Sequence, residues 1–389
     1  MSFDLEQDLN QRREQNLYRR TRMAQSPQAP VMEIDGHTYL TFCSNDYLGL
    51  ANHPMLVKAF KHAADEFGVG SGAAHLVNGH SYYHEKLEEA LAEFTGRDAA
   101  ILFSTGYMAN LGVVTALLDK QDGVFEDKWN HASLLDAGLL SGARFQRYLH
   151  NDMGNLGSRL KRSEARRKLI VTDGVFSMDG DWAQLDGVTE LAKQNDAWVM
   201  VDDAHGLGVL GESGAGLCEA QNQSQDDVQI LMGTLGKGMG TAGAFVAGSK
   251  ELIEYLTNFA RPYIYTTAMP AAIAAATLES INIVKNEPER RVHLQMLIKH
   301  FRDGAKQLGL NLMTSHTAIQ PVLVGDAQQA LNMSEALRQQ GIMVTPIRPP
   351  TVPVGTARLR VTLSASHSLE QVNQLLDALA ALSANTESN

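Results

Sequence analysis

Short apolar runs alternate with segments of helical periodicity from about residue 50 to residue 285. The runs end in polar or glycine-containing turns, as buried strands do. This alternation predicts an α/β fold in which helices cover both faces of a mostly parallel sheet. The expected strands are Ala99–Phe103, Leu169–Thr172, Trp198–Val201, Ile230–Met232 and Ala244–Ala247, and two of the expected helices are Leu252–Phe259 and Ala271–Val284.

The two ends of the chain have a different pattern. Residues 4–24 are charged and lack glycine, which predicts a surface helix that Pro27 and Pro30 end. Asp35-Gly36 is the expected turn of a hairpin that follows. The last hundred residues predict a small α+β domain with strands at Ile319–Val324 and Arg358–Leu363 and helices at Gln328–Gln340 and Leu369–Leu382. We therefore expect a large domain over residues 46–284 and a small one over 285–389, with residues 1–45 packed against the small domain.

Reactive side chains follow two of the expected strands. Asp202 and His205 come after one apolar run, and Thr234 and Lys237 come after the next. In open α/β sheets, ligands bind beyond the carboxyl ends of the strands. A lysine in a glycine-rich loop can form a Schiff base, and an aspartate can hold a pyridinium nitrogen. The pattern predicts an enzyme that uses pyridoxal phosphate (PLP).

Other interpretations of these residues remain open. Lys237 could be a solvated lysine in a turn, Asp202 could be a buried carboxylate bonded to neighbouring amides, and His205 could be structural. A phosphate-binding Walker loop is disfavoured, because it needs glycine where Leu231 stands and a hydroxyl residue where Gly238 stands.

Four further features of the sequence are candidates for function. The turn from Ser104 to Asn110 joins a strand to a helix and could bind the cofactor phosphate, although many such turns look alike. Ser177 offers a hydroxyl at the same sheet edge. Three histidines, His75, His80 and His84, could suggest a metal, but no carboxylate or cysteine completes a convincing set, and we expect none. The basic run 161–168 predicts a solvated helix face, with docking of an acidic carrier or coenzyme phosphates as the alternative.

Composition narrows the class of protein. Lys and Arg number 33 against 44 Asp and Glu, for a net charge of -11, which argues against nucleic acid or an anionic membrane as the partner. The two cysteines, Cys43 and Cys218, suggest neither a disulfide framework nor a cysteine-rich metal site. The first 22 residues lack the apolar core of a signal peptide, and no apolar run reaches the roughly 18 residues of a membrane span. We expect a cytoplasmic protein.

Several motifs resemble those of the α-oxoamine synthases, the PLP-dependent family that condenses an amino acid with an acyl thioester and releases CO₂. The resemblance extends from Leu17 to the last helix. It rests on residues 44–50 (SNDYLGL), 173–181 (DGVFSMDGD), 201–206 (VDDAHG) and the loop around Lys237. It implies fold type I of the PLP-dependent transferases, and a homodimer with active sites at the subunit interface.

The resemblance also implies roles for individual residues. Lys237 would carry PLP, Asp202 would pair with the pyridine nitrogen, and His205 would contact the ring oxygen. His131 would lie over the ring face and also contact the substrate. The other implied cofactor contacts are Gly106, Tyr107, Ser177 and Thr234, and the implied substrate contacts are Arg19, Asn45, Arg348 and Thr351. The family often has glutamate where this chain has Asp173, so the role of Asp173 stays open.

Residues 264–270, 347–353 and 356–360 resemble the branch of the family that uses L-alanine and a pimeloyl thioester, carried on coenzyme A or on an acyl-carrier protein. Within the family, the alternative is a glycine C-acetyltransferase that uses acetyl-CoA, and the segment 347–353 argues against it. A non-catalytic scaffold subunit is disfavoured by the intact Lys237 and Asp202. A nucleotide-binding module is disfavoured by the failed Walker spacing.

Overall fold

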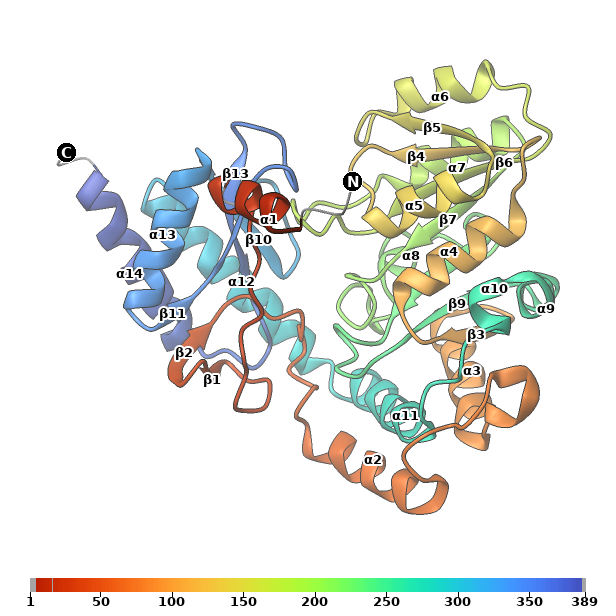
Figure 1. The fold of residues 1–389 in the computed structure, drawn as a ribbon, viewed down its shortest axis with the longest axis horizontal. Helices are drawn as coiled ribbons and strands as arrows, with labels where there is room; N and C mark the ends of the chain where they lie inside the picture. The colour runs from red at the N-terminus through yellow and green to blue at the C-terminus, as the bar shows by residue number, and fades with distance from the viewer. Residues whose placement is uncertain (1–4, 16, 387–389) are drawn as a thin grey trace.

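A seven-stranded sheet forms the centre of the larger part of the molecule (Figure 1). The computed structural model describes residues 5–15 and 17–386, with side chains to residue 382. The strand order is β3-β9-β8-β7-β6-β4-β5, and only β9 runs antiparallel to its neighbours. The strands are β3 (Ala99–Phe103), β4 (Gly123–Asp127), β5 (Arg144–Tyr148), β6 (Lys168–Asp173), β7 (Ala197–Asp202), β8 (Ile230–Thr234) and β9 (Ala244–Gly248). The predicted fold class is confirmed.

Both faces of this sheet are buried under helices. On β6, Leu169 and Val171 pack into one apolar cluster while Ile170 packs into the other, as the two-residue period of a strand requires. The first face is covered by α4 (Gly106–Leu117), α5 (Ala132–Leu140), α9 (Lys250–Phe259) and α10 (Arg261–Ile264). The second is covered by α3 (Tyr82–Thr95), α6 (Met153–Lys161), α7 (Leu185–Gln194), α8 (Leu217–Ala220) and α11 (Ala271–Asn286), with α2 (Pro54–Phe67) packed on α11.

The smaller part of the molecule contains two short sheets. One is antiparallel, in the order β10-β13-β12, with β10 (Ile319–Gly325), β12 (Thr345–Ile347) and β13 (Ala357–Thr362). The other joins the hairpin of β1 (Val31–Ile34) and β2 (His37–Thr41) to β11 (Ile342–Met343). The hairpin turns at Asp35 and Gly36, both with positive φ, as predicted. The helices of this smaller part are α12 (Glu289–Gln307), α13 (Ala327–Gln339) and α14 (Leu369–Thr386).

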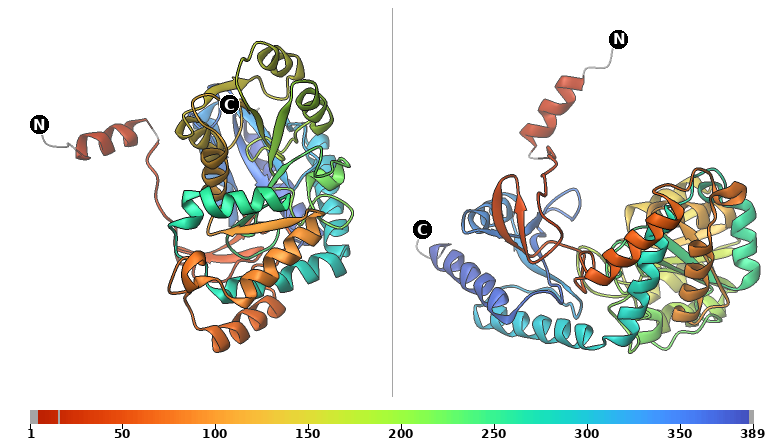
Figure 2. Two further views of the ribbon diagram at one scale, coloured as in Figure 1. Left: turned by 90° about the vertical axis from the view of Figure 1, so that its right-hand side faces the viewer. Right: turned by 90° about the horizontal axis from the view of Figure 1, so that it is seen from below.

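The N-terminal helix predicted over residues 4–24 is shorter in the structure. The helix α1 covers only Leu5–Glu14, buries none of its residues and projects from the body (Figure 2). After it the chain is extended, because the backbone of Met23 and Gln25 bonds to the hairpin residues Asp35 and Glu33. These hydrogen bonds replace those of a helix. Residues 4 and 16 of the expected segment lie outside the described residues.

Two further expectations need correction. The strands β4 and β5 are absent from the predicted set, since their polar residues hide the apolar pattern. The basic run 161–168 is not a helix face: α6 ends at Lys161, and β6 begins at Lys168. Arg166 and Arg167 lie on the turn between them, where both bind the carboxylate of buried Asp122.

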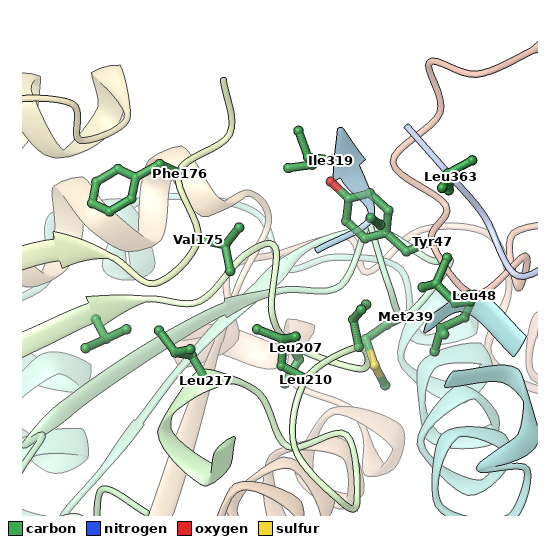
Figure 3. Packing of buried hydrophobic residues seen from close by; sticks show 14 of the residues in the cluster. Tyr47, Leu48, Val175, Phe176, Leu207, Leu210, Leu217, Met239, Ile319 and Leu363 are labelled. Carbon is green, nitrogen blue, oxygen red and sulfur yellow. The ribbon is translucent and has the colours of Figure 1, made fainter. Parts of the chain in front are cut away.

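One apolar cluster runs through both parts of the molecule. Tyr47, Ile319 and Leu363 belong to it together with Val175 and Leu207 of the larger part (Figure 3). Among the described residues, no helix has the length and apolar character needed to span a membrane.

Candidate active site

A cavity of about 180 Å³ lies at the carboxyl ends of the parallel strands, where ligands bind in open α/β sheets. It is lined by the end of β6, the loops after β7 and β8, and the first residues of α4 and α5. The lining residues are Gly106, Tyr107, Asn110, His131, Ser133, Asp173, Val175, Asp202, Ala204, His205, Met232, Thr234 and Lys237.

Asp202, the last residue of β7, is buried and held by two donors. The side-chain amide of Asn110 donates to its Oδ2 at 2.7 Å, and the backbone amide of Ala204 donates to its Oδ1 at 3.0 Å. These two neutral donors fix the orientation of the carboxylate, which lines the cavity and can pair with a cationic ligand atom.

His131 is linked to Asp202 through a chain of hydrogen bonds. Asn110 also donates to Ser133 Oγ at 2.9 Å, and Ser133 Oγ lies 2.7 Å from His131 Nδ1. The backbone amide of Ser133 donates to the same Nδ1 at 3.3 Å. In the neutral ring the proton is therefore on Nε2, which is free to donate to a ligand.

Lys237 faces two carboxylates. Burial lowers the pKa of Lys237 below its ordinary value, and the charges of Asp202 and Asp173 only partly oppose this effect. Burial, and then the charge of Asp202, raise the pKa of Asp173 well above its ordinary value. The site therefore favours a lysine that gives up its proton readily, which is what a nucleophilic or basic amine requires.

His205 is neutral at physiological pH. Burial, and after it the charges of Lys237 and Arg360, lower its pKa well below the ordinary value. The ring is fixed by a 2.6 Å hydrogen bond between Nδ1 and the hydroxyl of Tyr47. Arg360 in turn donates to Asn45 Oδ1 at 3.3 Å and to the carbonyl of Ser177 at 2.6 Å.

One end of the cavity is suited to an anion. Gly106 and Tyr107 are the first residues of α4, whose first-turn amides have no acceptor within the helix. Thr105 Oγ1 accepts from Met108, which leaves the earlier amides for a ligand. A Cβ on Gly106 would lie 2.7 Å from Thr234 Cγ2, so only glycine allows Thr234 this close to the helix start.

Most of the predicted cofactor residues line this cavity together: Gly106, Tyr107, His131, Asp202, His205, Thr234 and Lys237. The structure places Ser177 outside the lining, where its carbonyl accepts from Arg360. The predicted substrate residues Asn45, Arg348 and Thr351 also lie outside it, as does the exposed Arg19. Nε of Arg348 is buried and has no hydrogen-bond partner among the described residues.

Sequence reasoning assigned no individual role to Asn110, Ser133, Tyr47 or Arg360. Asn110 ends the turn expected to bind phosphate and lies one helical turn after Gly106, on the same face of α4, and Tyr47 and Arg360 lie within the motifs 44–50 and 356–360. The other three are brought to the site by tertiary contacts.

The structure brings together the three histidines considered as metal ligands. His75 and His80 share a hydrogen bond between their Nδ1 atoms of 2.8 Å. Both nitrogens of His84 are already engaged, with Ser81 and with the carbonyl of Met269. Coordination of a metal by His84 would have to break one of these bonds.

Comparison with known proteins agrees with this geometry. The sequence family described as aminotransferase class I and II matches residues 37–379. The chain belongs to this family. A relative from Cellvibrio japonicus (strain Ueda107) is 61% identical over 95% of this chain and 93% of its own length, and is named 8-amino-7-oxononanoate synthase. A relative of the same name from Pseudomonas entomophila (strain L48) is 60% identical over 98% of this chain and 97% of its own length.

Solved structures have the same fold. A serine palmitoyltransferase from S. paucimobilis with PLP and myriocin bound has a TM-score of 0.93 at 32% identity, over 99% of this chain and 98% of its own. An 8-amino-7-oxononanoate synthase from Francisella tularensis has a TM-score of 0.78 at 31% identity, over 90% of this chain and 99% of its own. The family resemblance predicted from the motifs is confirmed.

Proposed function

We propose that this chain is a PLP-dependent acyltransferase that condenses L-alanine with a pimeloyl thioester to give 8-amino-7-oxononanoate and CO₂, a step of biotin synthesis. The carrier released is coenzyme A or an acyl-carrier protein. The observation that supports this most is a single cavity that contains Lys237, Asp202 and His131, in a chain about 60% identical to enzymes of that name.

The residues of the cavity fit PLP. The start of α4 with Thr234 would hold the phosphate, His205 would contact the ring oxygen, and Asp202 would hold the ring nitrogen. Ser177, on the loop after β6, remains a proposed cofactor contact from outside the cavity lining. When bound, PLP supplies an electron sink for the negative charge that develops at Cα of the amino acid.

Lys237 is the base of the reaction. Its amine, with a pKa lowered by burial, removes the proton at Cα of alanine and can return it at the end of the cycle. Asp202 would hold the ring nitrogen, and Asn110 fixes the orientation of the Asp202 carboxylate.

His131 acts on the acyl substrate. Since its Nδ1 accepts from Ser133, its Nε2–H is available to donate to the acyl oxygen as charge develops there. Among the predicted substrate residues, Arg348 has a buried Nε with no hydrogen-bond partner in the described part of the chain, which fits a guanidinium that binds a carboxylate of alanine or pimelate. Arg19, Asn45 and Thr351 would line the same side.

We infer that the enzyme works as a homodimer. On α5, which directly follows His131, the side chains of Leu139 and Leu140 are 63% and 68% exposed, and Tyr107 in the cavity lining is 44% exposed. Exposed apolar side chains close to an active site are typical of a subunit interface. The free thiols of Cys43 and Cys218 support a reducing compartment, the cytoplasm.

The proposed reaction is tested by turnover assays with two amino acids and two acyl donors. Purified protein, reconstituted with PLP, is incubated with alanine or glycine and with pimeloyl or acetyl thioesters. Formation of 8-amino-7-oxononanoate from alanine and the pimeloyl thioester is expected. A clear preference for glycine and acetyl-CoA would instead identify a glycine C-acetyltransferase, and turnover of neither pair would refute the proposal.

A further inference from the structure

A partly buried histidine outside the cavity, His150, lies clamped between two carboxylates. Nδ1 of His150 lies 3.0 Å from Asp127 Oδ1, at the end of β4, and Nε2 lies 2.8 Å from Asp181 Oδ2. The ring of Trp129 stacks on the imidazole, with centroids 3.9 Å apart. With both nitrogens facing carboxylates, the ring donates to both only as a cation, and an aromatic face favours that cation further.

Asp181 ends a loop, residues 174–181, that joins the two parts of the molecule. Arg358 of β13 forms a 2.5 Å ion pair with Asp179, and Arg360 donates to the carbonyl of Ser177. The hydroxyl of Ser315 donates to the carbonyl of Gly180 at 2.9 Å. A Cβ on Gly180 would lie 2.4 Å from the carbonyl oxygen of Ile319, so the loop is packed closely against β10.

The same loop also borders the cavity. Asp173 directly precedes it and Val175 lies within it, and both residues line the cavity. Arg360, which binds the loop, also contacts Asn45. Movement of the loop would therefore shift Arg360 and Asn45 relative to Lys237.

We propose that His150 is a positioning residue. As a cation held between Asp127 and Asp181, it fixes loop 174–181, and the loop in turn fixes the position of the smaller part of the molecule relative to the cavity. The kinetic consequence rests on the function proposed above, whereas the structural consequence does not.

The charge of His150 gives the clamp a pH dependence. The charged groups that face it are Asp127 from β4 and Asp181 and Asp179 from the loop, with Arg358 beyond Asp179. Burial alone would lower the pKa of His150, but hydrogen bonds and charge from Asp127 and Asp181 outweigh burial and raise the pKa to about 9. The clamp is therefore intact at neutral pH and is released as the pH rises through about 9.

Tryptophan fluorescence reports the charge of His150 directly, because a protonated imidazole stacked on an indole quenches its emission. We expect emission to rise with a midpoint near pH 9 in the wild type and at lower pH in Asp181→Asn, which lacks one carboxylate. Trp129→Phe assigns the signal, since Trp182 lies near another histidine, His316.

Hydrogen exchange and kinetics test the positioning. Asp181→Asn should increase deuterium uptake in peptides that cover residues 174–181 and β13. It should also raise KM for the pimeloyl thioester by about fivefold to tenfold, with a smaller change in kcat, as expected when a contact that positions substrate groups is weakened. The wild-type KM should rise with the same midpoint as the fluorescence. The matched control is Asp303→Asn, which breaks an exposed ion pair with Lys299 on α12 and should behave as wild type.

Asp181 is partly exposed and asparagine has the same shape, so the variant is expected to fold, and its circular dichroism checks this. A fluorescence midpoint unchanged by Asp181→Asn, or deuterium uptake equal to that of the wild type, would overturn the proposal. Both measurements need no substrate. Failure of the wild type to make 8-amino-7-oxononanoate would therefore count against the proposed function alone.

Discussion

Asn110 is the residue whose loss should show how the site controls the orientation of Asp202. Its side-chain amide donates at 2.7 Å to Asp202 and at 2.9 Å to Ser133, and all three side chains are buried. Asn110→Ala removes both donors at once. A hydrogen bond to a charged group contributes about 1.5–3 kcal/mol net, and a neutral one about 1 kcal/mol.

If Asp202 loses its orientation, removal of the Cα proton of alanine should slow by about 10- to 100-fold, since about 1.4 kcal/mol corresponds to a factor of ten. The assay is exchange of the alanine Cα hydrogen into deuterated water, followed by NMR with PLP at saturation and no acyl donor. Asn110→Asp should slow exchange further, because a second carboxylate would lie beside Asp202. Asn286→Ala, a surface change on α11, is the matched control.

The reasoning would be refuted by exchange in Asn110→Ala within about twofold of the wild type at full PLP occupancy. In that case, the backbone amide of Ala204 would be sufficient to hold Asp202.

Three further predictions follow from the cavity and its surroundings. Borohydride reduction of the PLP-loaded protein should label Lys237, and a label mapped by mass spectrometry to another lysine would contradict its assignment. Arg348→Ala should lower kcat/KM by an amount that corresponds to about 2–4 kcal/mol of lost transition-state stabilisation, because a substrate carboxylate loses its partner. Unchanged kinetics for both substrates would exclude Arg348 from the site. Burial raises the pKa of Asp203 to about 8, against about 3.9 in an unfolded chain, so the unfolded chain loses this proton first and the free energy of unfolding should fall as the pH rises between these values. Asp203→Asn, which can still accept from the amide of Leu217, should flatten that decline in urea denaturation, and an equally steep decline would show that other groups cause it.

The apolar runs along the chain determined most of the large sheet, because buried strands must be apolar on both faces. They also determined where Asp202 and Lys237 lie, since both residues follow runs whose carboxyl ends meet at one sheet edge. The strands β4 and β5 escaped this reasoning for a physical reason. β4 buries Glu126 and Asp127, and β5 is an edge strand with exposed arginines. Neither segment therefore has the continuous apolar run that predicts a buried strand.

Tertiary structure alone decided which polar groups meet. Asn110 and Asp202 are 92 positions apart. Asp127 ends β4, whereas His150 and Asp181 lie in the separate loops after β5 and β6. Local pattern reports the period of a helix or strand, whereas these pairs depend on how whole elements pack. The N-terminal segment shows the same limit: its composition favoured a helix to residue 24, but hydrogen bonds to the hairpin hold Met23 and Gln25 in an extended chain. The sequence thus determined the strands and the chemistry at their ends, and packing determined the partners that tune this chemistry.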